Sequence, residues 1–543
     1  MQQKDDSWIL LSMGILFIVL ISVPYLWAFQ NAGSDYQFGG FLLNPQDGNS
    51  YLAKMYQGWQ GNWRFYLPYS AQPGDGGYLF LFYLGLGQIA RLSGGTLQTT
   101  FHLARILGAA VLVISLWNFF GKVLTTRRSR WLAFGLALFG SGMGWLAALF
   151  GLFTADFWVA EGYPFLSAYA NPHFPIGMAI LLWILTPELD AENIKQKKYG
   201  YLHDVLLIGA AFVLAIVLPF GIVVAGIVLA GLVFWYFWVE LSNLNGKSRE
   251  INEISGIIRR SEPSRKFFLV LLGGMPMLIY QVWITQNDPV LAIWNEQNFT
   301  VSPMIWDLTI SFSPVALLTI PGIYWVWREK KIAARTLLLW AGLGLLLLYI
   351  PWSLQRRFIL GYLIPLAGLA AIGLDHLFSR NRIFALAVIC LVILLIVPTN
   401  LMILLGGIQA VQAKEPKVIL SKEEMRGMNW LESNSPRDAL ILASPEMGLF
   451  IPAYTGRRVL YGHPFETVNA KQMQEVVINL LSDLNDEDGD SSLLDVSYIF
   501  YGPREWEIGA EKIEPGYKVV YSTGDIKIFE VQNLHSSPTD MGQ

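Results

Sequence analysis

The run WILLSMGILFIVLISVPYLWAF, from Trp8 to Phe29, decides the fold class of this chain. It contains no charged residue and is as long as the roughly 20 apolar residues that a helix needs to cross a bilayer. No small-residue cleavage pattern lies near its end, so we interpret it as a retained anchor and not a removed signal peptide. The chain is therefore expected to belong to a membrane.

Similar apolar runs follow along the sequence. The stretch 203–239 is too long for one helix and is interrupted at Pro219 and Gly221, which predicts a tight pair of helices. Together the runs predict an α-helical polytopic membrane protein with about eleven transmembrane helices. After Trp8–Phe29 the runs lie near 101–122, 131–152, 173–187, 203–219, 222–239, 267–285, 306–327, 335–352, 358–377 and 383–405.

The composition of the 543 residues agrees with this class. Hydrophobic residues make up 54% and charged residues 15%, whereas soluble proteins average about 25% charged residues. This excludes an ordinary soluble enzyme, a disordered protein and a nucleic-acid-binding protein. The single cysteine, Cys390, excludes a disulfide framework and a cysteine-based metal site.

The charge is unevenly distributed along the chain. From Gly406 onward the balance is −9, whereas the preceding residues carry +6. We therefore predict two domains: a transmembrane domain over 1–405, with an external loop at 30–100 that holds interfacial helices, and a soluble domain over 406–543. The residues near 78–92 are interpreted as an interfacial or re-entrant helix in that loop.

Basic residues predict the orientation of the chain. Connections on one side hold 20 Lys and Arg residues and those on the other side hold five. The positive-inside rule then places the N-terminus in the cytoplasm and the C-terminal domain outside, in a plasma or inner membrane. In the C-terminal domain, alternating patterns predict a small α/β fold. The predicted helices are 418–431 and 470–484; 439–443 is a short apolar run; the predicted strands are 459–461, 498–501, 517–522 and 526–531.

The external loop carries the first candidate for chemistry. It contains Asp47 just before a helical stretch that includes Tyr51, and several aromatic residues follow. Asp47 is either a helix N-cap or a catalytic carboxylate that deprotonates an acceptor hydroxyl. The aromatic residues suit either a sugar platform or a membrane-interface belt.

The next external loop carries Asp156, Glu161 and the motif Asn171-Pro172-His173-Phe174, and it has no Lys or Arg. The acids and His173 either hold a divalent cation or a phosphate, or serve as structural caps. Arg356 and Arg357 are adjacent on the side that otherwise nearly lacks basic residues. They indicate an anionic ligand, an acidic partner or anchoring to lipid headgroups. Arg105, early in a span, is expected to face the bundle interior and a partner.

These features resemble the integral-membrane glycosyltransferases of the C type, the superfamily of protein mannosyltransferases, aminoarabinose transferases and oligosaccharyltransferases. Asp47-Gly48-Asn49-Ser50-Tyr51 is similar to the first-loop motif, although many members have two adjacent acids there. Arg105 is similar to the arginine that follows that loop. Uncharacterised bacterial members are similar at three further stretches: Asn171–Phe174, Arg356–Phe358 and Tyr461–Thr467.

The resemblance implies a mechanism. The donor is a sugar on a polyprenyl phosphate from the bilayer, and the acceptor is a lipid, a glycan or a protein. Asp47 acts as base in a direct displacement, and Arg356, Arg357 and Arg105 stabilise the leaving phosphate. Glu161, His173, Tyr51, or His463 and Glu466 would orient the acceptor or a divalent cation, and the resemblance does not choose between them. A divalent cation, Mg²⁺ or Mn²⁺, would take its ligands from Asp47, Asp156, Glu161 and His173.

Two other classes of function remain open. A lipid or polysaccharide transporter would also need many spans and buried charge, but no internal repeat is visible in the sequence. A non-catalytic membrane assembly protein with an external binding domain is the second alternative. In that case the loop motifs would be structural.

Overall fold

A computed structural model describes residues 2–188, 197–242, 261–329, 333–482, 495–509 and 517–531. The chain forms two compact units, which we call the helical unit and the sheet unit. The helical unit comprises Met1–Pro24, His102–Tyr280 and Phe299–Gly407. The sheet unit comprises Tyr25–Phe101, Gln281–Asn298 and Ile408–Gln543. The predicted external loop is therefore grouped with the C-terminal residues, whereas the predicted domain boundary at 405/406 stays a prediction.

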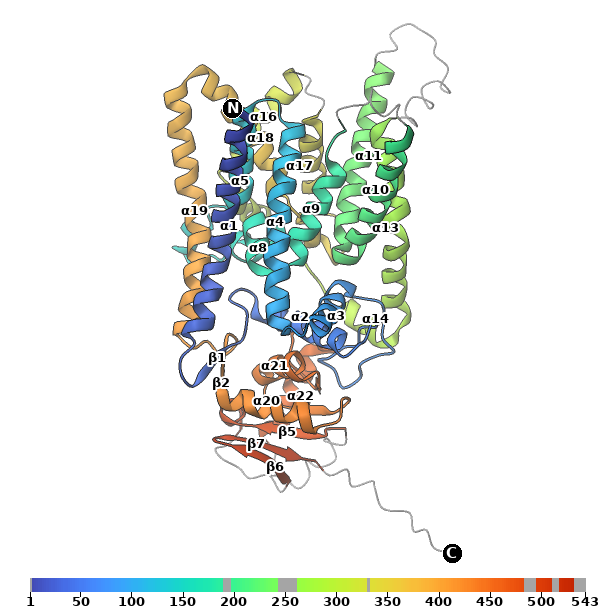
Figure 1. Cartoon of the computed structure of the whole chain (residues 1–543), viewed down its shortest axis with the longest axis vertical. Helices are drawn as coiled ribbons and strands as arrows, with labels where there is room; N and C mark the ends of the chain where they lie inside the picture. Colours follow the sequence, from blue (N-terminus) through green and yellow to red (C-terminus); the bar gives the residue numbers. More distant parts are fainter. Residues whose placement is uncertain are drawn as a thin grey trace, which may run out of the picture. The chain divides into compact units, whose positions relative to one another are not determined.

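The helical unit is built from long apolar helices (Figure 1). Its centre is α18 (Leu363–Arg380), which is buried over most of its length and packs against α5, α16 and α17. The other helices, four of which run on into the sheet unit, are α1 (Gln2–Asn31), α4 (Leu97–Val123), α5 (Arg127–Phe139), α6 (Gly144–Ala148), α7 (Ala155–Trp158), α8 (Pro164–Ala170), α9 (His173–Leu185), α10 (Lys197–Val217), α11 (Pro219–Ser242), α13 (Glu262–Asn287), α15 (Ile305–Phe312), α16 (Val315–Arg328), α17 (Arg335–Leu347) and α19 (Arg382–Gln412). The short 3₁₀ turns are η1 (Ala160–Gly162) and η3 (Gln355–Ile359).

The apolar helices confirm a polytopic membrane protein. Within the described residues, seven helices are long and apolar enough to cross a membrane, and the bent pair α15 and α16 makes up to eight. Three shorter apolar helices, α9, α10 and α17, lie at other predicted runs. The predicted break at Pro219 is confirmed, because α10 ends at Val217 and α11 begins with that proline. The total of about eleven spans stays a prediction.

The sheet unit contains a mixed five-stranded sheet in the order β4-β3-β5-β7-β6. The strands β4, β3 and β5 are parallel, and β7 and β6 continue the sheet antiparallel. A separate ribbon pairs β1 in the loop 30–100 with β2 in the C-terminal region. The strands are β1 (Tyr36–Phe38), β2 (Ile419–Ser421), β3 (Leu440–Leu442), β4 (Arg458–Val459), β5 (Tyr498–Tyr501), β6 (Lys518–Thr523) and β7 (Ile526–Glu530). The helices are α2 (Pro45–Trp59), α3 (Leu81–Ser93), α14 (Pro289–Gln297), α20 (Lys422–Asn434), α21 (Pro445–Thr455), α22 (Ala470–Ser482) and α23 (Pro503–Trp506).

The predicted α/β fold of the C-terminal region is confirmed, with one correction. The predicted helix 418–431 is wrong at its start, where residues 419–421 form β2. Ser421 ends this strand and begins α20 with a capping box in which Glu424 bonds back to its backbone. Residues 419–421 therefore form a strand because they pair with β1, although their sequence pattern alone favours a helix. The predicted helix 470–484 ends at Ser482, and its last two residues lie outside the described part of the chain.

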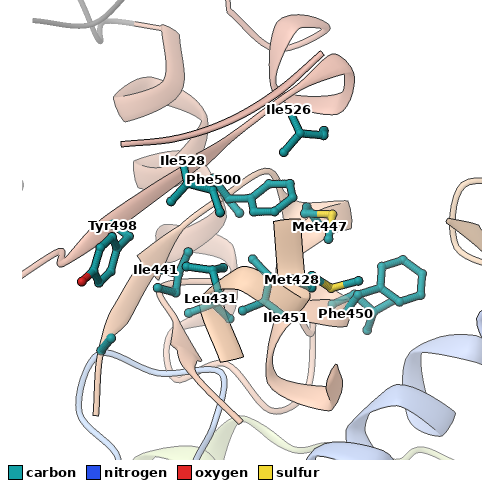
Figure 2. Packing of buried hydrophobic residues seen from close by; sticks show 14 of the residues in the cluster. Met428, Leu431, Ile441, Met447, Phe450, Ile451, Tyr498, Phe500, Ile526 and Ile528 are labelled. Atoms are coloured by element: carbon teal, nitrogen blue, oxygen red, sulfur yellow. The ribbon is translucent and has the colours of Figure 1, made fainter. Parts of the chain in front are cut away.

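Alternating side chains of the central strands fill two hydrophobic layers of the sheet unit. Ile441 and Phe500 point toward α20 and α21, as Figure 2 shows. Their neighbours Ile499 and Tyr501 belong to the cluster on the other face, which α22 covers. Burial of each large apolar side chain contributes about 1.5–3 kcal/mol. The period-two alternation thus builds the core from very short strands.

The buried carboxyl of Glu505 predicts a pH dependence of stability. Burial raises the pKa of Glu505 from 4.5 to about 7, although Ser444 donates two hydrogen bonds to it. Because the folded-state pKa is raised, the stabilisation is complete below about pH 4.5 and is lost as the pH rises through 7. We expect the full-length protein to lose about 3 kcal/mol between pH 4.5 and 8 from this group.

The expected loss is measured as thermal unfolding of the purified chain at the two pH values. Glu505→Gln should reduce the difference between them, whereas Glu475→Gln, at an exposed position on α22, should not. An unchanged difference in Glu505→Gln would contradict the assignment.

Candidate functional site

The first turn of α2 presents Asp47. The helix begins after Asn44, which has φ 48° and makes no side-chain cap, and Pro45 is the first helical residue. The N-cap interpretation of Asp47 is therefore wrong, because Asn44 takes that position and Asp47 lies inside the helix. The Asp47 side chain is 47% exposed, so it is open to a reacting group.

One face of α2 gathers polar groups next to Asp47. Ser50, Tyr51 and Lys54 follow it at helical spacings of three, four and seven residues. Tyr51 stacks on Tyr83 of α3 with ring centroids 4.3 Å apart. The Lys54 side chain is fully buried, and its ammonium lies 4.4 Å from the centroid of the Phe80 ring.

Facing this helix is the loop that carries His463 and Glu466. His463 is 2% exposed, and its Nδ1 accepts hydrogen bonds from the backbone N–H of Phe465 at 3.1 Å and of Glu466 at 3.2 Å. The Nε2 atom lies 3.6 Å from Oδ1 of Asp47. The loop motif, which resembled uncharacterised transferases, therefore contacts the first-loop acid within one unit.

A buried ion pair joins the loop to α2. Glu466 accepts hydrogen bonds from Lys54 and Ser50, and Lys54 also donates to the Ser50 hydroxyl at 2.5 Å. Burial acts to raise the pKa of Glu466, but the charge of Lys54 and the hydrogen bonds from Lys54 and Ser50 outweigh it and lower the pKa. Glu466 is therefore held as a carboxylate.

Sequence reasoning missed Lys54 and Ser50 as parts of this site. Lys54 is one of the five basic residues on the side that the sequence predicts to be external, and its spacing of seven from Asp47 places both on one helical face. The ion pair itself joins residues 412 positions apart, so no local pattern indicates it.

Gly48 explains why this chain lacks a second acid beside Asp47. A Cβ at position 48 would lie 2.2 Å from the ring of Phe41, which is 1% exposed. An acidic side chain at this position would have to displace that buried ring. The departure from the paired-acid pattern therefore follows from packing inside the loop.

The helical unit holds the two adjacent arginines in η3. Arg357 donates from Nη1 to Oε1 of Glu161 at 2.5 Å, and the Glu161 side chain is only 7% exposed. The guanidinium of Arg356 lies 4.8 Å from the ring centroid of Trp158. Glu161 is thus the local acidic partner that the position of Arg357 suggested, and the Arg357 side chain keeps 34% of its surface exposed.

Other candidates of the helical unit have structural partners. Asp156 is fully buried and accepts hydrogen bonds from Thr154 at 2.7 Å and from the backbone N–H of Gly144 at 2.9 Å. His173 begins α9 and is 9% exposed, with its ring 4.0 Å from that of Phe174.

Arg105 faces the interior, as its position in the span predicted. It is 1% exposed, and its Nη1 donates to the carbonyls of Ile21 and Ala168, each at 3.0 Å. These bonds tie α4 to α1 and α8. They favour a structural role for Arg105 over contact with a donor phosphate.

The residues suggested as metal ligands do not fit a metal site. In the described part of the chain, no three His, Cys, Asp or Glu side chains gather around one point. Asp156 and Glu161 are each engaged by the hydrogen bonds given above. We therefore derive no step through a metal ion.

In the sheet unit, Lys54 contacts Tyr51 and Glu466, and His463, three residues before Glu466, lies beside Asp47. In the helical unit, it brings together Glu161 and Arg357, with Arg356 beside them in η3. The contacts found for these candidate residues thus lie within the sheet unit or within the helical unit.

Comparison with known proteins identifies the fold as that of the C-type membrane glycosyltransferases. ArnT from Cupriavidus metallidurans, in its apo state, matches with TM-score 0.53 and 14% identity over 98% of this chain and 99% of that chain. The apo oligosaccharyltransferase from Archaeoglobus fulgidus matches with TM-score 0.55 and 12% identity over 91% and 69%. The archaeal oligosaccharyltransferase AglB from the same organism, solved with an inhibitory peptide and a dolichol-phosphate, matches with TM-score 0.53 and 11% identity over 92% and 70%. No protein-family model and no curated protein sequence matches the chain.

Proposed function

We propose that this chain is a membrane glycosyltransferase that moves a sugar from a polyprenyl-phosphate donor to an acceptor hydroxyl. The observation that carries the proposal is the half-exposed Asp47 in the first turn of α2, facing His463, in a chain with the C-type glycosyltransferase fold. An exposed carboxylate beside a buried histidine suits a general base.

The proposed reaction is a direct displacement at the anomeric carbon. The acceptor oxygen forms a bond to that carbon while Asp47 takes its proton. The bond from the carbon to the phosphate oxygen breaks, and the electron pair leaves with the polyprenyl phosphate. Inversion at the anomeric carbon follows from this single step.

A phosphate-linked donor is supported by two further observations. Arginine binds phosphate with a planar, permanently charged fork, and Arg356 and Arg357 are adjacent in η3. The archaeal oligosaccharyltransferase with the similar fold was solved with a dolichol-phosphate. We therefore assign both arginines to the leaving phosphate, with Glu161 orienting Arg357.

The proposal is tested with the purified full-length chain in proteoliposomes. A panel of polyprenyl phosphates carrying labelled hexoses, pentoses or aminopentoses is supplied with candidate glycan, lipid or peptide acceptors. Transfer of label with release of polyprenyl phosphate supports the proposal. Flipping of intact donor across the bilayer without transfer would favour a transporter instead.

Replacing either arginine should slow sugar transfer, because each is assigned to the phosphate of the donor. We expect Arg357→Gln and Arg356→Gln each to reduce kcat by about 10²-fold, because each removes a charge that stabilises the leaving phosphate. Arg357→Lys should keep part of the rate, since it keeps the charge and loses the fork. Steady-state kinetics measure both effects, and full activity in either glutamine variant would contradict its assignment.

We further propose that the sheet unit lies on the extracytoplasmic side of a plasma or inner membrane. The distribution of basic residues supports this orientation. A cysteine introduced at the exposed Asp438 should react with a membrane-impermeant maleimide in intact cells. Labelling only after lysis would reverse the orientation.

A further inference from the structure

The loop that carries His463 is built so that one particular ring nitrogen holds the proton. Two backbone N–H groups, those of Phe465 and Glu466, donate to Nδ1. An atom that accepts two hydrogen bonds cannot carry a proton of its own, so the proton of the neutral ring lies on Nε2. The tautomer of His463 thus follows from the loop geometry.

The Nε2 atom points toward the proposed base. It lies 3.6 Å from Oδ1 of Asp47, and no group in the described residues accepts a hydrogen bond from it at standard distance. A buried donor without an acceptor destabilises the folded state, so an acceptor near Nε2 is favoured. Hydrogen bonds in catalytic sites are often long in the free protein and shorten when substrate is bound.

The Lys54–Glu466 ion pair sets the distance between the loop and α2. Lys54 lies two turns after Asp47 on one face of α2, and Glu466 lies three residues after His463. The tilted rings of Tyr69 and Phe465 lie near the imidazole, at centroid distances of 5.7 and 6.3 Å. The two backbone hydrogen bonds to Nδ1 hold the histidine in this orientation.

We propose that His463 is a positioning residue for Asp47, donating a hydrogen bond from Nε2 to Oδ1 as the acceptor binds. This inference rests on the proposed function, because it deepens the role of the same carboxylate. Held by one oxygen, the carboxylate presents its other oxygen to the acceptor hydroxyl. The hydrogen bond from His463 would therefore act by orienting the Asp47 carboxylate. Misplacement of a reacting group by 1 Å can cost about 10²-fold in rate.

Two substitutions separate this role from a structural role of the loop. In His463→Asn, the amide oxygen can accept the two backbone hydrogen bonds, but no donor reaches the position of Nε2. In His463→Gln, the longer side chain brings an amide N–H near the position of Nε2. Positioning predicts that the asparagine variant loses activity and that the glutamine variant keeps most of it; a purely structural role predicts the reverse.

The kinetic test uses the full-length chain with its donor and acceptor. We expect His463→Asn to lower kcat by about tenfold or more with the donor KM unchanged, and His463→Gln to restore most of kcat. Equal kcat in wild type and His463→Asn would overturn the inference while leaving transfer itself established. A wild-type chain without transfer would instead overturn the proposed function.

A second test does not depend on activity. The full-length chain is labelled with ¹⁵N-histidine, and its six histidines are observed by NMR in micelles. We expect the signal that disappears in His463→Asn to show the tautomer protonated on Nε2. Its Nε2 shift should move in Asp47→Asn, because the Asp47 carboxylate already lies 3.6 Å from Nε2 before the acceptor binds. A proton on Nδ1, or no response to Asp47→Asn, would overturn the inference.

Discussion

Asp47→Asn is expected to reduce sugar transfer by about 10²–10⁴-fold, the contribution of a positioned general base. The amide has the size of the carboxylate but cannot take the acceptor proton. The folded state should be unchanged, because the side chain is 47% exposed and lies in the first turn of α2. Transfer from labelled donor is the measurement, and thermal unfolding of the same preparation reports on the fold.

Asp75 provides the matched control for this substitution. It is an exposed aspartate in the same loop, so Asp75→Asn removes the same charge away from the proposed base. We expect transfer within about twofold of wild type in this variant. If Asp47→Asn and Asp75→Asn were equally active, Asp47 would not be the base.

Glu466→Gln is expected to give the largest loss of stability. It leaves the ammonium of Lys54, which is fully buried, without a counter-charge. Breaking one partner of a buried ion pair costs about 3–5 kcal/mol. Unfolding of the full-length chain in detergent, followed by tryptophan fluorescence, measures the loss.

The double substitution Lys54→Met/Glu466→Gln separates the ion pair from simple loss of packing. With the charge of Lys54 removed, the chain should regain most of the stability lost in Glu466→Gln, because no uncompensated buried charge remains. A double variant no more stable than Glu466→Gln alone would mean that the pair is not coupled.

More of the fold than of the candidate site could be predicted from the sequence. The apolar runs located the long helices, and the short run of aromatic and β-branched residues at 498–501 located β5 at its observed bounds. The start of α20 was placed wrongly, since residues 419–421 pair with a strand that lies far away in the sequence. Arg105 was correctly expected to face the interior, but only the structure identified its carbonyl partners.

The sequence by itself determined that this is a polytopic membrane protein with a sheet-containing C-terminal region and an acid early in its first loop. These are local properties, because apolar length, alternation and charge are written in neighbouring residues. Only the tertiary structure decided which groups meet: Lys54 with Glu466, Asp47 with His463, and Glu161 with Arg357. Such pairs depend on how distant segments pack, and the burial of the paired groups determines how much each pair contributes to stability.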